Sequence, residues 1–299
     1  MLQKAEHIFL PKTKTAGEGK IYICPTPIGN RADISLRVLE VLRSVDTVYA
    51  EDTRVSAKIL AMHGIEAHVE RLDEAVMSKK LDGLINRVCA GEHIAYCSDA
   101  GMPGISDPGL RLVRAAQEAK VSYCVLPGPS ATTTAYVASG FTHPHFYFGG
   151  FFPRKGGEIK NLLESLKVLD AVLIFYESPK RLTNSLNAIA RSFPLREVAV
   201  CRELTKLHEE IVRLSAIDIY EFFAQRETLR PIKGEIVVVI DAPHTQEQAD
   251  DEKRRITDAQ KQAQKLKDAG TLYNKEIVSH LQEEFGLARN VAYDIVHKM

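Results

Sequence analysis

The sequence predicts an α/β protein of two domains with a small helical appendage at the C-terminal end. At 299 residues the chain has room for two domains of about 150 residues each. Short apolar runs alternate with amphipathic segments, which is the βαβα rhythm of a largely parallel sheet covered by helices. Glycines and prolines gather directly after several apolar runs, where such a sheet places its ligand-binding loops.

The composition excludes several classes of protein. With 45% hydrophobic and 26% charged residues, the chain is typical of a globular protein and not of a disordered, collagenous or coiled-coil one. The 39 Lys and Arg balance the 39 Asp and Glu, so a nucleic-acid surface would have to be local. Apolar runs have strand length, well short of the roughly 18 residues of a membrane span. Residues 1–14 lack the apolar core of a secretory signal, so we expect a cytoplasmic protein without a membrane partner.

The first domain is predicted to span residues 20–140, after a flexible polar leader at residues 1–19. Its pattern predicts strands over 21–24, 47–51, 94–97 and 122–126, and helices over 34–43, 55–63, 110–119 and 130–139. We interpret residues 141–157, which hold two Pro, four Gly and five Phe, as a linker with an aromatic stretch.

The second domain is predicted to span residues 141–242, with the linker at 141–157 as its first segment. Strands are expected over 171–176, 198–201, 210–214 and 235–240, and helices over 159–168, 179–191 and 217–224. Fewer helices per strand indicate a sheet with antiparallel members. Residues 243–299 form the helical tail, with a helix over 253–267 and two further helical patterns separated at Gly286.

Three loops that follow predicted strands outline a ligand cleft: residues 25–30 (PTPIGN), 98–104 (SDAGMPG) and 127–130 (PGPS). Any one of them is also explained as a simple turn into the next helix, but three on one rim favour a ligand. The first loop has neither the GxGxxG spacing nor the GxxxxGK[ST] phosphate cradle. A dinucleotide or ATP is therefore disfavoured, and a cofactor without phosphate, such as S-adenosylmethionine (SAM), fits better.

Eight ordered motifs carry a resemblance over about residues 20–240: PTPIGN at 25–30, AEDTR at 50–54, SDAG at 98–101, DPG at 107–109, PGPSA at 127–131, FYESP at 175–179, RELTK at 202–206 and KGE at 233–235. Together they resemble the rRNA ribose methyltransferases of the tetrapyrrole methylase superfamily. The resemblance implies a class III SAM methyltransferase fold, a homodimer, and SAM bound between the two domains. The implied product is a 2′-O-methylated cytidine of 16S rRNA in the decoding region of the small ribosomal subunit.

The same resemblance implies which residues bind SAM. One wall of the cleft would consist of Pro25, Asp99, Ala100, Met102, Ile105, Ser130 and Ala131, and the other of Tyr176, Leu204 and Gly234. Met102 stands where the family's Asp-Ala-Gly-x-Pro loop has Thr, while Pro103 keeps the pattern. One wall residue therefore differs, and the turn of the loop is expected to remain.

Methyl transfer to a ribose hydroxyl requires an in-line approach, a route for the hydroxyl proton and contacts to the RNA backbone. Acidic candidates for the proton are Asp52, Asp99, Glu177 and Glu203, of which we predict Asp52, Glu177 and Glu203 as catalytic. Candidates for phosphate contacts are Arg31, Arg54, Arg154, Lys155, Arg181, Arg202 and Lys206. No metal is expected, since the ten His and five Cys show no HExxH or CxxC pattern.

Each of these assignments has a structural alternative. Asp52 and Arg54 would equally form a local ion pair, Arg202 and Glu203 a salt bridge between domains or subunits, and positioning alone would leave no essential base. Two other functions stay open: a small-molecule methylase of the same superfamily, acting on a tetrapyrrole or a modified amino acid, and a catalytically silent RNA-binding module. The AEDTR and FYES strings favour the RNA methyltransferase.

Overall fold

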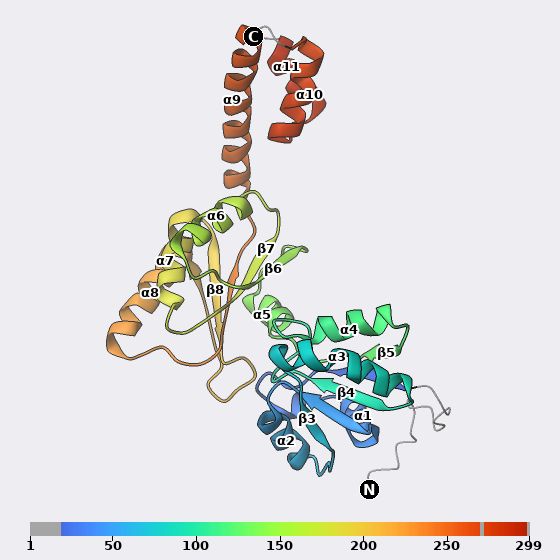
Figure 1. Cartoon of the computed structure of the whole chain (residues 1–299). Coiled ribbons are helices and arrows are strands. Elements are labelled where there is room, and N and C mark those ends of the chain that lie inside the picture. The colour runs from blue at the N-terminus through green and yellow to red at the C-terminus, as the bar shows by residue number, and fades with distance from the viewer. Residues whose placement is uncertain (1–18, 270–271, 298–299) are drawn as a thin grey trace.

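The computed structural model describes residues 19–269 and 272–297. Two α/β lobes are followed by a helical tail (Figure 1). We call the first sheet with helices α1–α4 the N-lobe, and the second sheet with helices α5–α8 the C-lobe. Apart from Gly19, the predicted leader lies outside the described residues.

Within the described residues the N-lobe sheet has five parallel strands in the order β3-β2-β4-β1-β5. The strands are β1 (Lys20–Cys24), β2 (Thr47–Ala50), β3 (Val69–Arg71), β4 (His93–Cys97) and β5 (Ser122–Val125). The helices are α1 (Leu36–Ser44), α2 (Thr53–Met62), α3 (Glu74–Cys89) and α4 (Gly109–Glu118), with a short 3-10 helix η1 (Arg31–Asp33) before α1. The predicted parallel βαβα arrangement of this lobe is confirmed.

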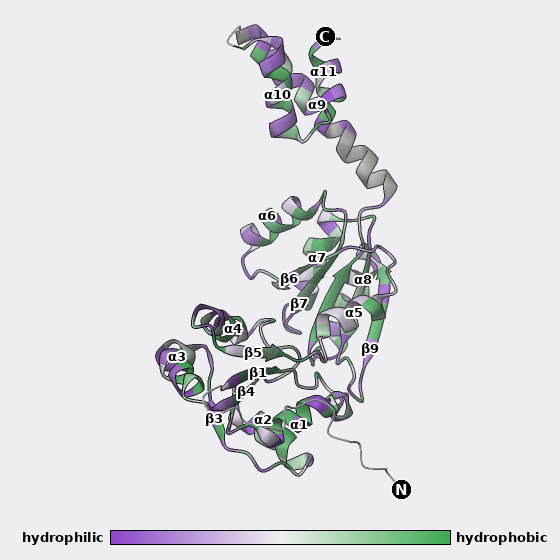
Figure 2. Ribbon diagram, turned by 90° about the vertical axis from the view of Figure 1, so that its right-hand side faces the viewer, coloured by the Kyte–Doolittle hydropathy of each residue, from purple (hydrophilic) through white to green (hydrophobic). Residues whose placement is uncertain are grey.

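Alternation along the strands divides the N-lobe core between two faces, because successive strand side chains point to opposite sides. Tyr22 and Cys24 of β1 pack with α1 and α2 on one face. Ile21 and Ile23 pack with α3 and α4 on the other. In Figure 2 the helices on both sides of this sheet carry hydrophobic as well as hydrophilic residues.

The sequence pattern predicts neither β3 nor α3. β3 is a three-residue edge strand without a buried side chain, too short to show alternation. α3 does bury Met77, Leu84 and Val88 on one face, and these positions follow helical spacing. Asp73 caps α3 by accepting a hydrogen bond from the Val76 backbone N–H at 2.8 Å.

The C-lobe sheet, again counted over the described residues, has the strand order β6-β7-β10-β8-β9. β6 and β7 are parallel, and the remaining pairs are antiparallel, as the sequence predicts. The strands are β6 (Phe146–Phe151), β7 (Val172–Glu177), β8 (Glu197–Arg202), β9 (Glu210–Ser215) and β10 (Ile236–Ile240). The helices are α5 (Ala131–Ser139), α6 (Gly156–Leu166), α7 (Leu182–Ser192) and α8 (Ala216–Leu229).

Two features of the C-lobe differ from the sequence prediction. α5, expected in the first domain, packs Ala135 and its neighbours against β7, β8 and β10 of the second sheet. The aromatic stretch predicted as part of a linker contains a strand, β6, with an irregularity between Phe148 and Phe151. A Cβ at Gly149 would lie 2.1 Å from the Phe175 ring, so this glycine allows close packing instead of marking a linker.

The tail consists of α9 (Thr245–Ala269), α10 (Asn274–Phe285) and α11 (Arg289–His297). It has its own small core, in which Ala259 and Ala263 of α9 contact Ile277, Leu281 and other apolar side chains of α10 and α11. Gly286 ends α10 with a φ of 61°, the left-handed conformation that glycine adopts readily. Figure 1 shows this unit at the far end of the C-lobe from the N-lobe.

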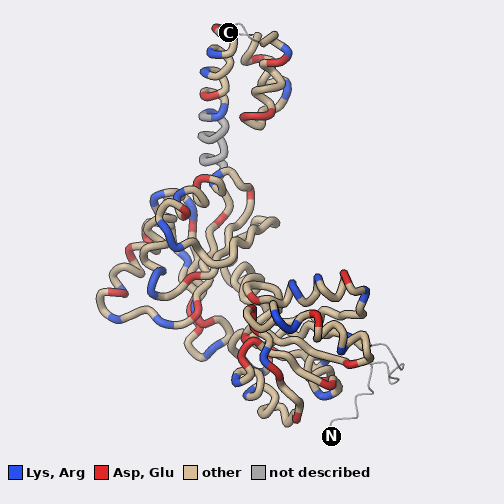
Figure 3. The backbone as a smooth tube through the Cα atoms, viewed as in Figure 1, with Lys and Arg blue, Asp and Glu red and all other residues tan. Residues whose placement is uncertain are grey.

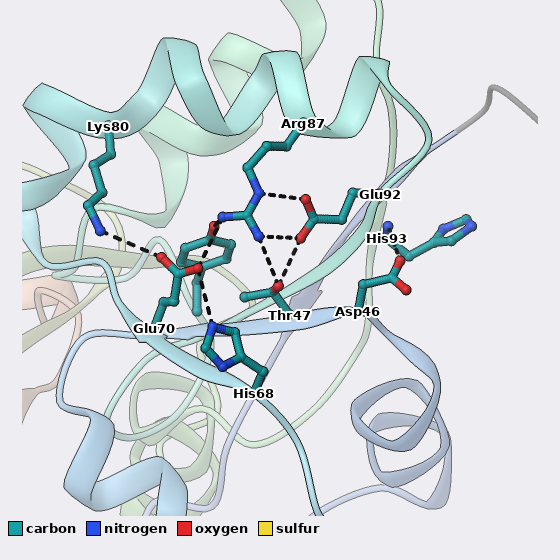
Figure 4. A network of polar contacts seen from close by, with 9 residues as sticks. Asp46, Thr47, His68, Glu70, Lys80, Arg87, Glu92 and His93 are labelled. Carbon is teal, nitrogen blue, oxygen red and sulfur yellow. Dashed lines mark hydrogen bonds and ion pairs between the residues drawn. The ribbon is translucent and has the colours of Figure 1, made fainter.

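A polar network connects residues near the amino ends of the N-lobe strands, opposite the edge that carries the loops after β1, β4 and β5 (Figure 4). Arg87 of α3 donates to Glu92 at 2.6 Å and to Glu70 at 3.0 Å, and also to the hydroxyls of Thr47 and Tyr49. Burial would raise the pKa of Glu70, but the hydrogen bond and charge of Arg87 outweigh it and lower that pKa. We assign this network a structural role.

Among the described helices, none combines the length and the apolar content that crossing a membrane requires.

Candidate active site

A cleft of about 390 Å³ opens between the two lobes, and loops from both sheets line it. The N-lobe contributes the loops after β2, β4 and β5, including Glu51, Asp99 and Ser130. The C-lobe contributes the ends of β7 and β8 and the start of β10, including Tyr176, Leu204 and Gly234.

The three loops singled out in the sequence follow β1, β4 and β5, and these strands are direct neighbours in the sheet. A pair of backbone hydrogen bonds between Thr26 and Gly101, each 3.0 Å, ties the first loop to the second. The Thr26 hydroxyl also donates to the Ser98 carbonyl at 3.0 Å. Gly101 has a φ of 81°, so this contact uses a conformation that favours glycine.

Aromatic side chains form part of the C-lobe wall. The Tyr176 hydroxyl lies 2.9 Å from the Thr132 hydroxyl of α5, and burial raises the pKa of Tyr176. Phe148 and Phe151 pack edge-on against the Tyr176 ring, with centroid distances of 4.9 and 5.5 Å. Phe151 lines the cleft and is 60% exposed, so a planar ligand can reach it.

Residues 203–206 join the lobes. The Asn30 backbone N–H donates to the Thr205 hydroxyl at 2.9 Å, and a Cβ at Gly29 would lie 2.7 Å from the Leu204 carbonyl. Glu203 and Thr205 have φ values of 53° and 64°, which is strained for residues with a side chain, above all for a β-branched one. This loop is therefore held in a costly conformation at the edge of the cleft.

The cleft is acidic. Of the described residues that line it, five carry carboxylates (Glu51, Asp99, Asp107, Glu177 and Glu235), and none is Lys, Arg or His. Glu177 pairs with Arg181 at 2.5 Å and Glu235 with Lys206 at 2.9 Å. The remaining three carboxylates have no ion-pair partner among the described residues. Such a site favours a cation and disfavours polyphosphate.

Two of these carboxylates hold protons more tightly than usual. Burial, followed by the charges of Asp99, Asp107 and Asp73, raises the pKa of Glu51. Burial also raises the pKa of Asp107, against the lowering effect of hydrogen bonds from the Gly104 and Gly109 backbone N–H groups at 2.8 Å each. Asp99 accepts a hydrogen bond from the Asp52 backbone N–H at 2.9 Å.

Nine of the ten residues assigned to SAM by resemblance lie in the lining of this cleft: Asp99, Ala100, Met102, Ile105, Ser130, Ala131, Tyr176, Leu204 and Gly234. Pro25 is buried outside the lining, under Gly128, where an added Cβ would lie 2.3 Å from its ring. The structure thus brings these nine positions together, and their binding of SAM stays a prediction.

The three residues predicted as catalytic are all engaged in ion pairs. Asp52 caps α2 and pairs with Arg54 at 2.6 Å, and hydrogen bonds from the Arg54 side chain and backbone lower the pKa of Asp52 to about 2. Glu203 pairs with Lys206 at 2.8 Å, which lowers its pKa. Glu177 is fully buried against Arg181. Of the three, only Glu177 belongs to the cleft lining.

The predicted RNA-binding residues lie outside the cleft lining and fall into two groups. Arg181, Arg202 and Lys206 are less than a third exposed and pair with Glu177, Glu210 and Glu203, respectively. The exposed group consists of Arg31, Arg54, Arg154 and Lys155, of which Arg54 pairs with Asp52 and Lys155 with Glu158. Figure 3 shows Lys and Arg interspersed with Asp and Glu over both lobes. RNA binding by these residues stays a prediction.

Several lining residues were not assigned to the site from sequence, chiefly Glu51, Asp107, Phe151 and Glu235. Glu51, Asp107 and Glu235 do belong to the AEDTR, DPG and KGE motifs, and Glu51 directly follows a strand. That position is the signal that could have found it. No group of three or more His, Cys, Asp or Glu side chains within residues 19–269 and 272–297 is arranged to hold a metal ion.

The fold is that of an α/β methylase. The structure superposes on that of a diphthine synthase with a TM-score of 0.58 and 14% identity, over 78% of this chain and 94% of the other. A family model described as Tetrapyrrole (Corrin/Porphyrin) Methylases matches residues 20–219. The chain belongs to the tetrapyrrole methylase family, and the fold predicted from the sequence is confirmed.

Within that family the chain is similar to proteins named Ribosomal RNA small subunit methyltransferase I. The Thermotoga maritima protein of that name is 40% identical over 74% of this chain and 98% of its own length. The Bacillus subtilis protein is 33% identical over 93% of this chain and 94% of its own length. The resemblance recognised in the sequence motifs is thereby confirmed.

Proposed function

We propose that the protein is a SAM-dependent methyltransferase that methylates the 2′-oxygen of a cytidine ribose in 16S rRNA, in the decoding region of the small ribosomal subunit. One observation carries the proposal: nine positions that the sequence resemblance assigns to SAM, drawn from loops of both lobes, line a single acidic cleft. The names of the similar proteins support rRNA as the substrate. Because that substrate is cytoplasmic, we place the protein in the cytoplasm.

The chemistry of the cleft fits SAM. When bound, SAM supplies a methyl group on a positively charged sulfur, and its amino group carries a second positive charge. Asp99 and Asp107 provide negative charge without an ion-pair partner among the described residues, and such charge attracts cations. Apolar side chains such as Met102 and Leu204 offer surface for an adenine ring.

The lobes would position the ribose for reaction. The hydrogen bond from Asn30 to Thr205 fixes the N-lobe loop against the C-lobe loop, so both walls keep their spacing. A fixed spacing favours an in-line approach of the 2′-oxygen to the methyl carbon. Arg31, Arg54, Arg154 and Lys155 are exposed, and we propose that they contact RNA phosphates together with Arg181, Arg202 and Lys206.

We propose that the active form is a homodimer. Neither lobe shows an extended basic field (Figure 3), and two copies would double the positive surface available to a folded RNA. Val137 and Phe146 are 76% and 43% exposed on the neighbouring elements α5 and β6, and apolar groups of this kind suit a subunit contact. Sedimentation that shows only monomer at full activity would contradict the dimer.

The proposed function is tested with purified protein, labelled SAM, and small ribosomal subunits or free 16S rRNA from cells that lack the protein. We expect transfer of the label to one ribose without added metal. Transfer to protein or to a small molecule, with none to rRNA, would instead support the small-molecule methylase. SAM binding by calorimetry separates both enzymes from a silent RNA-binding module, which would bind no SAM.

A further inference from the structure

Glu51 differs from the other carboxylates of the cleft in having no partner. Glu177 and Glu235 are paired with Arg181 and Lys206. Asp107 and Asp99 accept backbone hydrogen bonds. Within the part of the chain that the structure describes, the Glu51 carboxylate makes neither a hydrogen bond nor an ion pair, although it lines the cleft. Its oxygens are thus available to a ligand.

The backbone places Glu51 beside the loop that the family uses for SAM. β2 and β4 are parallel neighbours, with Ala50 opposite Cys97, so Glu51 follows its strand at the same level as Ser98 and Asp99. The Asp52 backbone N–H donates to the Asp99 carboxylate at 2.9 Å, which anchors the chain immediately after Glu51. Glu51 is therefore the first residue after a strand, held between that strand and the hydrogen bond of Asp52.

Tyr96 lies behind this corner of the cleft, in the apolar core that α3 and α4 cover, and does not line the cleft. Tyr96 of β4 is fully buried, and its hydroxyl has no hydrogen-bond partner among the described residues. Burial raises the pKa of Tyr96, and the charges of Asp107, Glu51 and Asp99 raise it further. A buried hydroxyl without a partner is unusual. The core around Tyr96 gives the Glu51 corner an apolar backing, and the ligand contacts of this corner fall to the carboxylates that line the cleft.

The charged and titratable groups around Glu51 explain how it would behave as a base. Asp99 follows β4, Asp107 precedes α4, Asp73 caps α3, and Tyr96 lies within β4. Their repulsion and the burial of the site stabilise the protonated form of Glu51. A carboxylate with a raised proton affinity and no cationic partner accepts a proton more readily than the ion-paired Asp52 or Glu203.

We propose that Glu51 is the general base of the methyl transfer, an inference that rests on the proposed function. The ribose 2′-oxygen forms its bond to the methyl carbon while the carbon–sulfur bond breaks and sulfur keeps the electron pair. The hydroxyl proton passes to a Glu51 carboxylate oxygen and from there to solvent. The products are the 2′-O-methyl ribose, S-adenosylhomocysteine and one released proton.

The test compares Glu51→Gln with wild type and with Glu66→Gln, an exposed glutamate between α2 and β3, in the full-length chain. SAM affinity is measured by calorimetry and methyl transfer by single turnover at saturating SAM and rRNA. We expect Glu51→Gln to keep its SAM affinity within about threefold. Its transfer rate should fall on the order of 10²- to 10⁴-fold, the usual contribution of a general base, whereas Glu66→Gln should match wild type.

The pH dependence adds a readout that a merely structural role would not change. The wild-type single-turnover rate should rise with pH and level off above the pKa of the base, and Glu51→Gln should lose this rise. Glu51→Asp, which keeps the carboxylate, should recover part of the rate and retain the rise. This second variant also covers the case in which the Gln variant folds poorly.

An unchanged rate in Glu51→Gln, or a loss explained by weaker SAM binding alone, would overturn the assignment. An intact pH-dependent rise in Glu51→Gln would do the same. Failure of the proposed function is distinguishable, because wild type itself would then transfer no methyl group to rRNA ribose.

Discussion

The buried ion pair between Glu177 and Arg181 gives the sharpest stability prediction. The Glu177 side chain is 0% exposed, and besides Arg181 it accepts hydrogen bonds from the Ser178 backbone N–H and the Ser185 hydroxyl. Arg181 also donates to the carbonyls of Phe152 and Pro153 at 3.1 Å each. The pair therefore links the cleft floor to the segment that leads to Arg154 and Lys155.

Arg181→Met keeps most of the apolar stem and removes the charge. Breaking a buried pair from one side costs about 3–5 kcal/mol, because the other charge stays buried without a counterion. Ser178 and Ser185 still solvate the Glu177 carboxylate, so we expect the lower end, about 3 kcal/mol, which corresponds to a loss of roughly 6–12 °C in Tm for a chain of this size. Adding Glu177→Gln removes the stranded charge and should restore part of that loss.

Urea and thermal unfolding of wild type, both single variants and the double variant measure this effect. Arg114→Met is the matched control, because Arg114 pairs with Glu118 at an exposed helix position, with 81% and 65% of the side chains accessible. Such a surface pair contributes at most about 1 kcal/mol. If Arg181→Met destabilises the protein no more than Arg114→Met, or if the double variant is less stable than Arg181→Met, the reasoning is refuted.

Three further predictions concern the cleft and its surroundings. Gly101→Val should weaken SAM binding at least tenfold, because φ is 81° and an added Cβ would lie 3.3 Å from Ile28; calorimetry decides, with the unobstructed Gly83→Val as control. Replacing both Arg154 and Lys155 by Ala should lower the salt slope of RNA binding by roughly 0.7–0.9 per lost phosphate contact with unchanged SAM affinity, and an equal slope would assign both residues to the surface alone. Burial and neighbouring carboxylates raise the pKa of Glu51, so the folded state binds the Glu51 proton more tightly than the unfolded state does. As pH rises from the unfolded pKa through the folded pKa, wild type should therefore lose stability relative to Glu51→Gln. A stability difference between the two proteins that does not vary with pH would contradict this.

Much of the fold was predictable because the strands are strongly patterned. β10 reads Ile-Val-Val-Val-Ile and is buried along its whole length, as expected of a central strand. The N-lobe strands alternate their contacts between two helical layers, which gives the βαβα rhythm. β6 was less accessible to prediction, because Gly149 is needed for contact with Phe175, and glycine in a short aromatic run is equally typical of a linker.

The sequence predicted the loops of the site, but it did not predict which carboxylates line the cleft. The motifs located the loops after β1, β4 and β5, because glycine allows the chains to approach closely and proline fixes the backbone of the turns. The pair of Asp52 with Arg54, two residues away, is local and is expected from the sequence as an alternative to catalysis. Which carboxylate lines the cleft depends instead on how loops of distant segments meet, so the sequence does not distinguish Glu51 from its neighbour Asp52. The packing of α5 on the second sheet is likewise a tertiary contact.

The central claim is tested most directly by mapping ribose methylation in 16S rRNA by mass spectrometry. Small subunits from cells that lack the protein are analysed before and after incubation with the purified chain and SAM. We predict one new 2′-O-methyl group, on a cytidine of the decoding region, that is absent without SAM. An unchanged pattern of ribose methylation in both the cells and the reaction would contradict the proposed function.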